Sequence, residues 1–573
     1  MRSVRSPNVV GAALCRDRIA PYFAPASSRG KPAPTARFEC RSAAGITDRG
    51  IGRRSTLTDA RMGNAAGLRL SLSMNSILNK REARCDQPHG LAPLARRWAM
   101  IFLALAGAWV APAQRTADPR PNIVFILLDN IGQEWFGCFG SEEGTTPEID
   151  RLAASGVRFA NCYTTTVCGP SRVQLLTGRY PFRTGWYLHH DAALYSGGGF
   201  DWKREVTIAR VLRDAGYATG IAGKWQVNNL YDEPDAIRQH GFQESLVWPG
   251  SIDRDKVDAS FQAKFQQAIR DADADFLQEA TRKIESRYWD PVMIRNGRRE
   301  VAKGKYGPDE YQAFAFDFMQ RHRDRPFFLY HAVVLAHGSS AAHAISTTPE
   351  NQANPPKDTK AAYAAMVRYA DRQVGDFVRQ LEKLGLRDNT IVMIAADNGT
   401  EGAISGRRNG RTVQGGLYQL NEAGGNVAFV VNSPKRVPGG RVGSLVDFTD
   451  IFPTLCEFAR ADRPKGVTID GQSFAGYLGG TAPLPRKWIF NEYRPDRTVR
   501  DVRYKLWSNG KLYDLTADPG ETRPIIAGTN AEADRARAQL QSVLNSMPPE
   551  TPLPFPHRSL SAFRQITAQR KGK

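Results

Sequence analysis

The sequence predicts an α/β protein in which helices sandwich a large central, mostly parallel sheet, with a smaller α+β domain at the C-terminus. Two continuous apolar runs, Asn122–Leu128 and Thr390–Ala396, are typical of strands that are buried on both faces. Helical patterns separate the predicted strands, and strands that alternate with helices favour a parallel sheet. After residue 478 the chain changes to short strands and turns, as in Tyr504–Leu515, which predicts the smaller domain.

The remaining elements are predicted from helical spacing, capping residues and short apolar runs. In chain order they are a helix that Thr146-Pro147 begins and Gly156 ends, a helix at Thr207–Ala215, a short strand ending at Lys224, a helix at 361–384 and a strand at Val427–Val431. Each of the two long apolar runs is followed directly by an Asp-Asn pair. Because ligands in such sheets bind beyond the carboxyl ends of the strands, we expect a metal site at that edge.

The first 113 residues differ in composition and hydrophobic pattern from the rest of the chain. Residues 1–73 are rich in Arg, Ser, Ala and Gly without hydrophobic periodicity, so we interpret residues 1–95 as a disordered extension or as a wrongly assigned start, with translation beginning near Met74. Residues 96–113 contain a basic pair, an apolar run and Ala111-Pro112-Ala113, which are the parts of a secretory signal peptide. The apolar run is shorter than the ~20 residues of a membrane span. We therefore expect export to the periplasm or the extracellular space and no integral span in the mature chain; an uncleaved anchor is the alternative.

Charge and cysteine content exclude two classes of protein. The 573 residues carry a formal charge of +20, but residues 1–113 hold 18 Lys and Arg against 6 Asp and Glu and so account for +12 of it. The modest remainder does not support nucleic-acid binding, although a basic patch would attract an anionic substrate. Four cysteines lie beyond residue 113, too few for a disulfide scaffold. We expect a catalytic α/β domain at 119–478 and a C-terminal α+β domain with a basic tail at 479–573.

Cys168 opens the most distinctive motif. It is followed by Gly169-Pro170-Ser171-Arg172, and Pro170 suits the first turn of a helix that Gly178 would end. Cys168 would then lie just ahead of a helix N-terminus, with Arg172 one turn further on. That setting predicts a lowered thiol pKa or a bound anionic group; the alternative is a half-buried structural cysteine.

The twelve residues from Cys168 to Arg179, C-G-P-S-R-V-Q-L-L-T-G-R, resemble the signature of the sulfatase family. The similarity runs from about Pro121 to Pro519 and includes G-K-W at 223–225 and A-A-D-N-G at 395–399. The resemblance implies the alkaline-phosphatase-like fold, one bound Ca²⁺ and a formylglycine that a maturation enzyme makes from Cys168. The hydrate of that aldehyde would be the nucleophile.

The same resemblance implies roles for individual residues. The metal ligands would be oxygen donors of the kind that Ca²⁺ prefers, namely Asp129, Asn130, Asp397 and Asn398. Arg172 would steady the nucleophile, and Lys224 would contact both the nucleophile and the sulfate. His337 would contact the leaving-group oxygen and supply its proton.

Three positions depart from the family pattern. Asn130 stands where the family has a second Asp, which removes one negative charge from the metal site. Gln226 replaces a His; a glutamine can hydrogen-bond the substrate but cannot act as a base. By its spacing from Glu422, Leu417 replaces a Lys that binds sulfate. The candidates for supplying the missing function are Arg411, with Arg407 and Arg408 beside it, and also His189 and His190.

The leading prediction is a calcium-dependent hydrolase of a sulfate ester, acting on a sulfated small molecule or polysaccharide. The substituted positions leave open a weakened or inactive homologue that binds sulfated ligands. A phosphodiesterase or phosphonate hydrolase on the same fold is a third hypothesis, because one fold can support several kinds of reaction.

Overall fold

The computed structural model describes residues 120–192, 198–250, 287–337 and 346–555, with scattered positions between 260 and 276. All described residues belong to one unit, Val110–Lys573. The expected extension at 1–95 and signal peptide at 96–113 lie outside the described residues. Within the described residues, no helix has the length and apolar character needed to cross a membrane.

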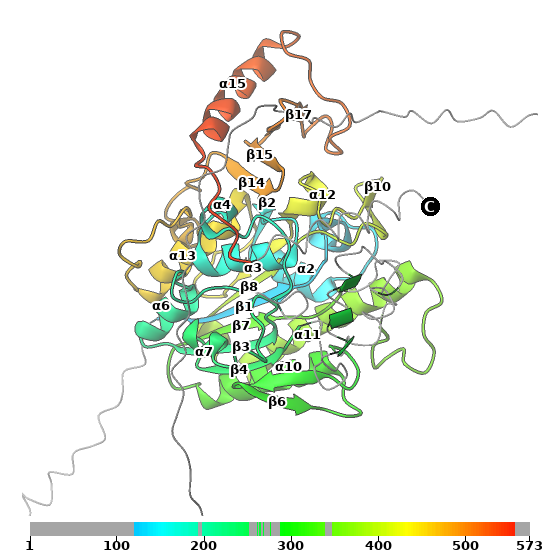
Figure 1. Cartoon of the computed structure of the whole chain (residues 1–573), viewed down its shortest axis with the longest axis vertical. Coiled ribbons are helices and arrows are strands. Elements are labelled where there is room, and N and C mark those ends of the chain that lie inside the picture. The colour runs from blue at the N-terminus through cyan, green and yellow to red at the C-terminus, as the bar shows by residue number, and fades with distance from the viewer. Residues whose placement is uncertain are drawn as a thin grey trace, which may run out of the picture. The chain divides into compact units, whose positions relative to one another are not determined.

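An eleven-stranded mixed sheet forms the centre (Figure 1). In spatial order its strands are β11 (Asn426–Val427), β2 (Val157–Tyr163), β12 (Phe429–Asn432), β8 (Thr390–Ala396), β1 (Asn122–Leu128), β7 (Phe327–Ala332), β3 (Ala218–Lys224), β4 (Glu244–Trp248), β5 (Val292–Arg295) and β6 (Arg298–Val301), with β13 (Arg441–Asp447) also paired to β2. The five strands from β8 to β4 are parallel to one another. The pairs β12–β8 and β4–β5 on either side are antiparallel, so the predicted parallel arrangement holds for the centre of the sheet.

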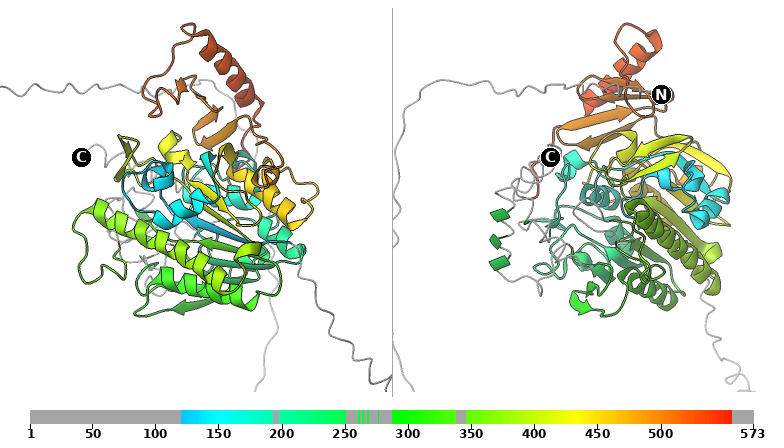
Figure 2. Two further views of the ribbon diagram at one scale, coloured as in Figure 1. Left: turned by 180° about the vertical axis from the view of Figure 1, so that it is seen from behind. Right: turned by 90° about the vertical axis from the view of Figure 1, so that its right-hand side faces the viewer.

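Helices cover both faces of the sheet, which explains why β1 and β8 are apolar after their first residues. Ile123, Phe125 and Leu127 pack into one core together with residues of the helices α3 (Cys168–Thr177), α6 (Ile208–Asp214) and α13 (Ile451–Ala459). Val124, Ile126 and Leu128 point the other way, as successive strand residues must, into a core with α10 (Gly307–Arg321) and α11 (Thr359–Lys383). In Figures 1 and 2 these two long helices lie together on one face of the sheet.

The predicted helices are present with small shifts at their ends. Thr207 caps α6 by accepting a hydrogen bond from the amide of Arg210, and Gly178 ends α3 in a left-handed conformation with φ 66°. The predicted strand at Val427–Val431 is divided, because β11 and β12 pair with opposite ends of β2. The shorter helices are α2 (Pro147–Ala154), α4 (Pro181–Thr184), α7 (Ala236–Gln239), α12 (Glu422–Gly425) and α14 (Ala475–Leu478), with 3₁₀ turns η1 (Gln133–Trp135), η2 (Gly137–Phe139), η3 (Arg387–Asn389) and η4 (Phe448–Asp450).

A smaller antiparallel sheet follows near the C-terminus, as predicted. Its strands are β14 (Ile489–Tyr493), β15 (Asp496–Arg500), β16 (Tyr504–Trp507) and β17 (Leu512–Asp514). Helix α15 (Ala531–Ser546), red in Figure 1, packs on β15 and β16 and shares a separate apolar core with them. A further two-stranded hairpin consists of β9 (Ser405–Arg408) and β10 (Arg411–Gln414).

Candidate active site

The carboxyl ends of the parallel strands bring the predicted site residues to one edge of the sheet. Asp129 follows β1, Asp397 follows β8, and Lys224 is the last residue of β3. The amide of Asp397 donates to the carbonyl of Leu128 at 2.9 Å, which continues the pairing of β1 with β8 past the strand ends. All three charged side chains are fully buried.

Ion pairs join these side chains to Arg172 of α3. The Lys224 Nζ lies 2.8 and 3.0 Å from the two carboxylate oxygens of Asp129. Arg172 Nη2 lies 2.7 Å from Asp397 Oδ2 and 3.8 Å from Asp129 Oδ1. Charge-assisted contacts of this length in a buried site hold each group in a fixed orientation.

Cys168 lies in the middle of these charges. It is the first residue of α3, only 3% exposed, and its Sγ is 3.5 Å from Asp129 Oδ1 and from Asn130 Oδ1. Burial raises the pKa of the Cys168 thiol well above its ordinary value, and the nearby Lys224 only partly offsets this. The sequence-based expectation of a lowered thiol pKa is therefore wrong, because it considered the helix N-terminus and Arg172 but not the loss of water.

The four predicted metal ligands adjoin one another and suit calcium by donor type. The amide of Asn130 donates to Asp397 Oδ1 at 3.1 Å, and Asn398 Nδ2 donates to Asn130 Oδ1 at 2.6 Å. Asn398 Oδ1 is buried and has no hydrogen-bond partner among the residues that the structure describes, an arrangement that a bound cation would satisfy. Burial and the neighbouring carboxylate of Asp129 raise the pKa of Asp397. A divalent cation would favour the ionised form that this environment disfavours.

His337 lies close to the nucleophile position. His337, Cys168 and Asp129 each offer one potential ligand atom, and these three atoms lie within 4.8 Å of one another. His337 is half-buried, and Tyr288 donates a hydrogen bond to its carbonyl. The structure therefore groups His337 with the residues that the sequence placed around the nucleophile.

The substituted positions have other local partners. Gln226 directs its Nε2 to Asp191 Oδ2 at 3.1 Å and adopts a positive φ of 66°. Leu417 is 8% exposed, and its amide donates to the carbonyl of Thr400. Neither side chain can exchange a proton.

The arginines of the preceding loop lie on the β9–β10 hairpin. Arg407 pairs with Glu142 at 2.9 Å, and Arg408 Nε donates to the carbonyl of Phe139. Arg411 is solvent-exposed on β10. The hairpin thus directs two of these three guanidinium groups to η2 and the loop after it rather than to the buried carboxylates.

The two adjacent histidines differ in position. His190 stacks on Phe555 with ring centres 4.2 Å apart, and its Nε2 is 3.2 Å from the carbonyl oxygen of Gly198, so it packs between distant chain segments. His189 faces Tyr418, the residue after Leu417, with ring centres 6.0 Å apart. Burial lowers the pKa of His189 to about 4, which keeps this imidazole neutral at pH 7.

The sequence did not single out Arg287, which also reaches this cluster. Its Nη1 lies 4.0 Å from Asp129 Oδ2, its side chain is 2% exposed, and its guanidinium carbon is 3.9 Å from the ring centre of Trp248. Arg287 belongs to no motif and no periodic pattern. Only the position of Trp248 at the end of β4 would have indicated it.

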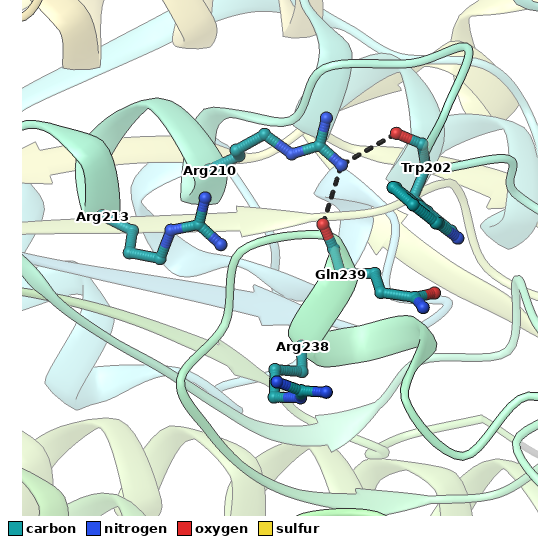
Figure 3. A pocket seen from close by; sticks show the side chains of 5 residues that line it. All are labelled: Trp202, Arg210, Arg213, Arg238 and Gln239. Carbon is teal, nitrogen blue, oxygen red and sulfur yellow. Dashed lines mark hydrogen bonds between the residues drawn. The ribbon is translucent and has the colours of Figure 1, made fainter.

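An arginine-lined surface pocket of about 420 Å³ lies elsewhere (Figure 3). Arg210 donates to the carbonyls of Trp202 and Gln239, and Arg213 and Arg238 pair with aspartates close to them in sequence. The described residues that line it include no nucleophile and no proton-exchanging group. The strand-end cluster is therefore the better candidate for chemistry.

The comparisons with known proteins all indicate the same family. The family model described as Sulfatase matches residues 121–461. The chain is 30% identical over 491 residues to arylsulfatase A of Homo sapiens, covering 77% of this chain and 90% of that protein. It is 27% identical over 492 residues to an N-acetylgalactosamine-6-O-sulfatase of Bacteroides thetaiotaomicron, covering 74% of this chain and 92% of that protein.

A solved structure shows the same fold. The crystal structure of Ps i-CgsB in complex with k-i-k-neocarrahexaose superposes with a TM-score of 0.60 at 23% identity, covering 79% of this chain and 99% of that chain. At this level of identity the match shows only that the two chains share a fold.

Proposed function

This chain belongs to the sulfatase family of sulfuric ester hydrolases, and from that premise we propose that it hydrolyses a sulfate ester on a carbohydrate, using a formylglycine made from Cys168 and one calcium ion. The observation that carries the proposal is the position of Cys168 at the N-terminus of α3. It lies within 3.5 Å of Asp129 and Asn130, with Lys224 and Arg172 paired to the carboxylates around it.

The surroundings of Cys168 favour a converted residue over a free thiol nucleophile. A buried, neutral thiol is a weak nucleophile, whereas the hydrate of formylglycine supplies one hydroxyl to attack sulfur and a second whose deprotonation releases the sulfate. The Asp129 and Asn130 side-chain oxygens lie where they would accept hydrogen bonds from a hydroxyl at position 168. These contacts orient the nucleophile.

Positive charge at this edge stabilises the negative charge that develops on the sulfate oxygens. Lys224 and Arg172 are buried, and buried cations held by fixed partners act more strongly than they would in water. His337 is the candidate proton donor to the leaving alcohol, because imidazole exchanges protons near neutral pH and a guanidinium does not.

Calcium would be held by the side-chain oxygens of Asp129, Asn130, Asp397 and Asn398. When bound, it would supply Lewis-acid polarisation and offset the charge of the two buried carboxylates. The amide at position 130 lowers the negative charge of the ligand set, so we expect weaker calcium binding than a set with three aspartates would give.

The names of several relatives support a sulfated sugar as the substrate. One relative is named as an N-acetylgalactosamine-6-O-sulfatase and another as an ulvan-active sulfatase. We therefore propose a sulfated carbohydrate as the substrate. We also propose that a maturation enzyme converts Cys168 and that the chain is exported through the segment at 96–113.

A binding-only homologue is the second candidate. It is favoured by Gln226 and Leu417, which stand where the family has groups that exchange protons, and by the bonding of Gln226 to Asp191. The intact run from Cys168 to Arg179 favours the enzyme, because a binding protein has no chemical need for it.

The test is turnover of a panel of sulfated saccharides and an aryl sulfate, with the matched aryl phosphate as control, by protein produced in a host that has the maturation enzyme. We expect calcium-dependent sulfate release that exceeds phosphate release. Saturable binding of sulfated saccharides without turnover of any ester would support the binding-only homologue. Faster phosphate release would favour a phosphoesterase.

A further inference from the structure

Three arginines and a tryptophan line the surface pocket of Figure 3, which the proposed reaction does not use. They come from α6, from α7 and from the segment before α6, and they are Trp202, Arg210, Arg213 and Arg238, with Gln239 beside them. The pocket holds about 420 Å³, which is within the range of sites for small ligands. An indole ring among guanidinium groups suits a ligand that has both an apolar face and negative charge.

Backbone carbonyls hold the guanidinium of Arg210 in this pocket. Its Nη2 donates to the carbonyl of Trp202 and to that of Gln239, at 2.8 Å each, as Figure 3 shows. These two bonds also tie the segment that carries the Trp202 ring to α7. Burial and the neighbouring charge of Arg213 lower the pKa of Arg210, and Asp214 offsets only part of this shift. An anion in the pocket would favour the charged form that this environment disfavours.

The other two arginines take part in exposed ion pairs. Arg213 lies 2.7 Å from Asp214 and Arg238 lies 3.2 Å from Asp235, and the two aspartate side chains are 61% and 62% exposed. Each aspartate contacts the Nε and Nη2 side of its guanidinium. A guanidinium has five N–H donors, so its Nη1 side can bind a second acceptor. Because exposed ion pairs are weak, both arginines can turn toward a ligand at little cost.

The neighbouring charges largely balance one another. Asp201 and Lys203 are one carboxylate and one cation on either side of the tryptophan in the sequence, and both are exposed. Glu205 is paired with Arg179 at 3.0 Å and with Arg204 at 3.3 Å. Since two aspartates pair with two of the three lining arginines, the pocket suits a group with a single negative charge and several acceptor oxygens, such as a sulfate ester.

The ring of Trp202 provides the apolar side of the pocket. The side chain is half-buried, and the nearest cations to its ring centre are Lys203 Nζ at 5.5 Å and the guanidinium carbon of Arg210 at 5.8 Å. Both distances are close to the ~6 Å limit of a cation–π contact, so these cations do not stack tightly on the ring. The C–H groups on the face of a sugar ring can pack on such an indole, next to donors for the sulfate that the sugar carries.

The pocket lies at the opposite edge of the sheet from Cys168. Helix α7 precedes the amino end of β4, and the carbonyl of Gly241 accepts a hydrogen bond from Thr219, the second residue of β3. Lys224 of the candidate active site is the last residue of β3, roughly 16 Å further along at ~3.3 Å per residue. A small sulfate ester bound at Cys168 cannot also reach the pocket, whereas a polysaccharide can.

We propose that this pocket is a second, non-catalytic site that binds a sulfated sugar residue of a polysaccharide. Trp202 packs on the sugar ring, and the three arginines donate hydrogen bonds to the sulfate oxygens. Binding here holds the polymer near the enzyme and raises its effective concentration at the catalytic site. The choice of a sulfated ligand rests on the proposed sulfatase function; the inference goes beyond it, because it assigns a second site and favours a polymer over a small ester.

The experiment measures the binding of dextran sulfate by calorimetry, with unsulfated dextran of the same length for comparison. The protein carries Cys168→Ala, so no turnover interferes. Arg213→Met combined with Arg238→Met removes two exposed guanidinium groups and leaves the Arg210 anchor in place. We expect this double variant to bind dextran sulfate about 10-fold more weakly. Trp202→Ala should weaken binding by about 3-fold, and unsulfated dextran should bind to none of these proteins.

Arg379→Met is the matched control. Arg379 pairs with Asp376, three residues earlier on α11, at 2.7 Å, as Arg238 pairs with Asp235. Helix α11 packs on the other face of the sheet from α6. This substitution therefore removes the same kind of charge at a distant place, and it should leave the affinity for dextran sulfate unchanged.

Several outcomes would overturn the proposal. One is an unchanged affinity of the double variant for dextran sulfate. Another is an equal loss in Arg379→Met, which would indicate attraction by the overall charge. Inorganic sulfate that binds as tightly as dextran sulfate would indicate a simple anion site, and a DNA oligonucleotide of the same charge that binds as tightly would indicate a site for any polyanion. Equal melting temperatures of the variants and their parent would show that the losses are not due to unfolding.

Turnover by the converted enzyme separates the two proposals. The double variant should raise KM for a sulfated polysaccharide and leave kcat/KM for an aryl sulfate unchanged; equal losses for both substrates would contradict the inference. Dextran sulfate binding that depends on the pocket, in a protein that hydrolyses no sulfate ester, would contradict the enzyme and keep the inference. Hydrolysis of sulfated saccharides with a polymer affinity that ignores the pocket would do the opposite.

Discussion

Two buried clusters of charged side chains in this molecule have similar composition, but they differ in how completely their polar atoms are hydrogen-bonded. The strand-edge cluster comprises Asp129, Asn130, Cys168, Arg172, Lys224, Asp397 and Asn398. The interface cluster comprises Tyr163, Glu422, Arg500, Lys505 and Glu521, and it joins the large sheet to the C-terminal sheet. Both combine Arg and Lys with carboxylates in surroundings that are largely closed to water.

The interface cluster is fully partnered. Glu422 accepts from Arg500 at 3.0 Å, from Lys505 at 3.3 Å and from Asn426 at 3.1 Å, and Tyr163 donates to it as well. Lys505 also reaches Glu521 at 3.0 Å. A buried network in which every charge has several partners rigidifies a fold.

The strand-edge cluster leaves polar atoms without partners. Three buried atoms have no hydrogen-bond partner within the described part of the chain: Asn398 Oδ1, Arg172 Nε and, at one of the substituted positions, Gln226 Oε1. Such atoms in a native fold call for an explanation, and a ligand is the simplest one. We therefore propose that the saturated cluster serves stability and that the unsaturated one serves binding and catalysis.

Cys168→Ala should have the largest effect and the sharpest contrast between activity and stability. Removing the nucleophile should lower kcat for a sulfate ester by about 10³-fold or more. The melting temperature should change little, because the hydrogen bonds of Cys168 Sγ to the described residues are two weak ones of 3.5 Å. Turnover equal to that of the unsubstituted protein would remove the nucleophile assignment.

Arg500→Met should give the reverse pattern. Removing one partner of a buried ion pair leaves Glu422 partly uncompensated, which should cost about 3–5 kcal/mol of unfolding free energy. Denaturant unfolding measures this loss. The kcat/KM of the folded protein should change far less than it does in Cys168→Ala, and a comparable fall in both quantities would erase the contrast between the clusters.

Calcium chelation should act on the strand-edge cluster alone. Loss of an ion present at 100 times its Kd removes about 2.7 kcal/mol of stability, together with activity. Adding calcium back should restore both. An unchanged melting temperature and rate after exhaustive chelation would remove the metal site from the account.

The loss of stability at acidic pH should depend on the interface cluster. Burial opposes ionisation of Glu422, but Arg500 and Lys505 hold its pKa at about 2, below the ordinary 4.5. Because the folded state lowers this pKa, its contribution is present above pH 4.5 and is lost as the pH falls toward 2. The melting temperatures of the unsubstituted protein and Glu422→Gln should therefore differ at pH 7 and converge toward pH 2. A gap that stays constant with pH would show that the carboxylate charge is not what stabilises the interface.

Local patterns in the sequence predicted the centre of the fold. After their first residues, Asn122 and Thr390, the runs that became β1 and β8 are apolar because both faces of these strands are buried, and that property is visible without a structure. The antiparallel flanks were not predicted. The pairing of β12 with β8 and of β5 with β4 depends on how distant segments meet, which periodicity does not report.

The candidate site was predicted wherever a motif or a strand end marks it. Asp129, Cys168 and Lys224 come together because the fold aligns their strand and helix ends. Arg287 was missed because a tryptophan ring and a returning strand position it. The direction of the thiol pKa was wrong because burial is a property of the assembled fold.

The most direct test of the central claim is the mass of the tryptic peptide Phe159–Arg172 after alkylation, from protein made in a host that has the maturation enzyme. The peptide contains Cys162, a buried free thiol that serves as an internal control for alkylation. The account predicts an alkylated Cys162 and, at position 168, a residue that has lost sulfur, gained an aldehyde and resists alkylation. Two alkylated cysteines, with a known sulfatase converted in the same cells, would contradict it.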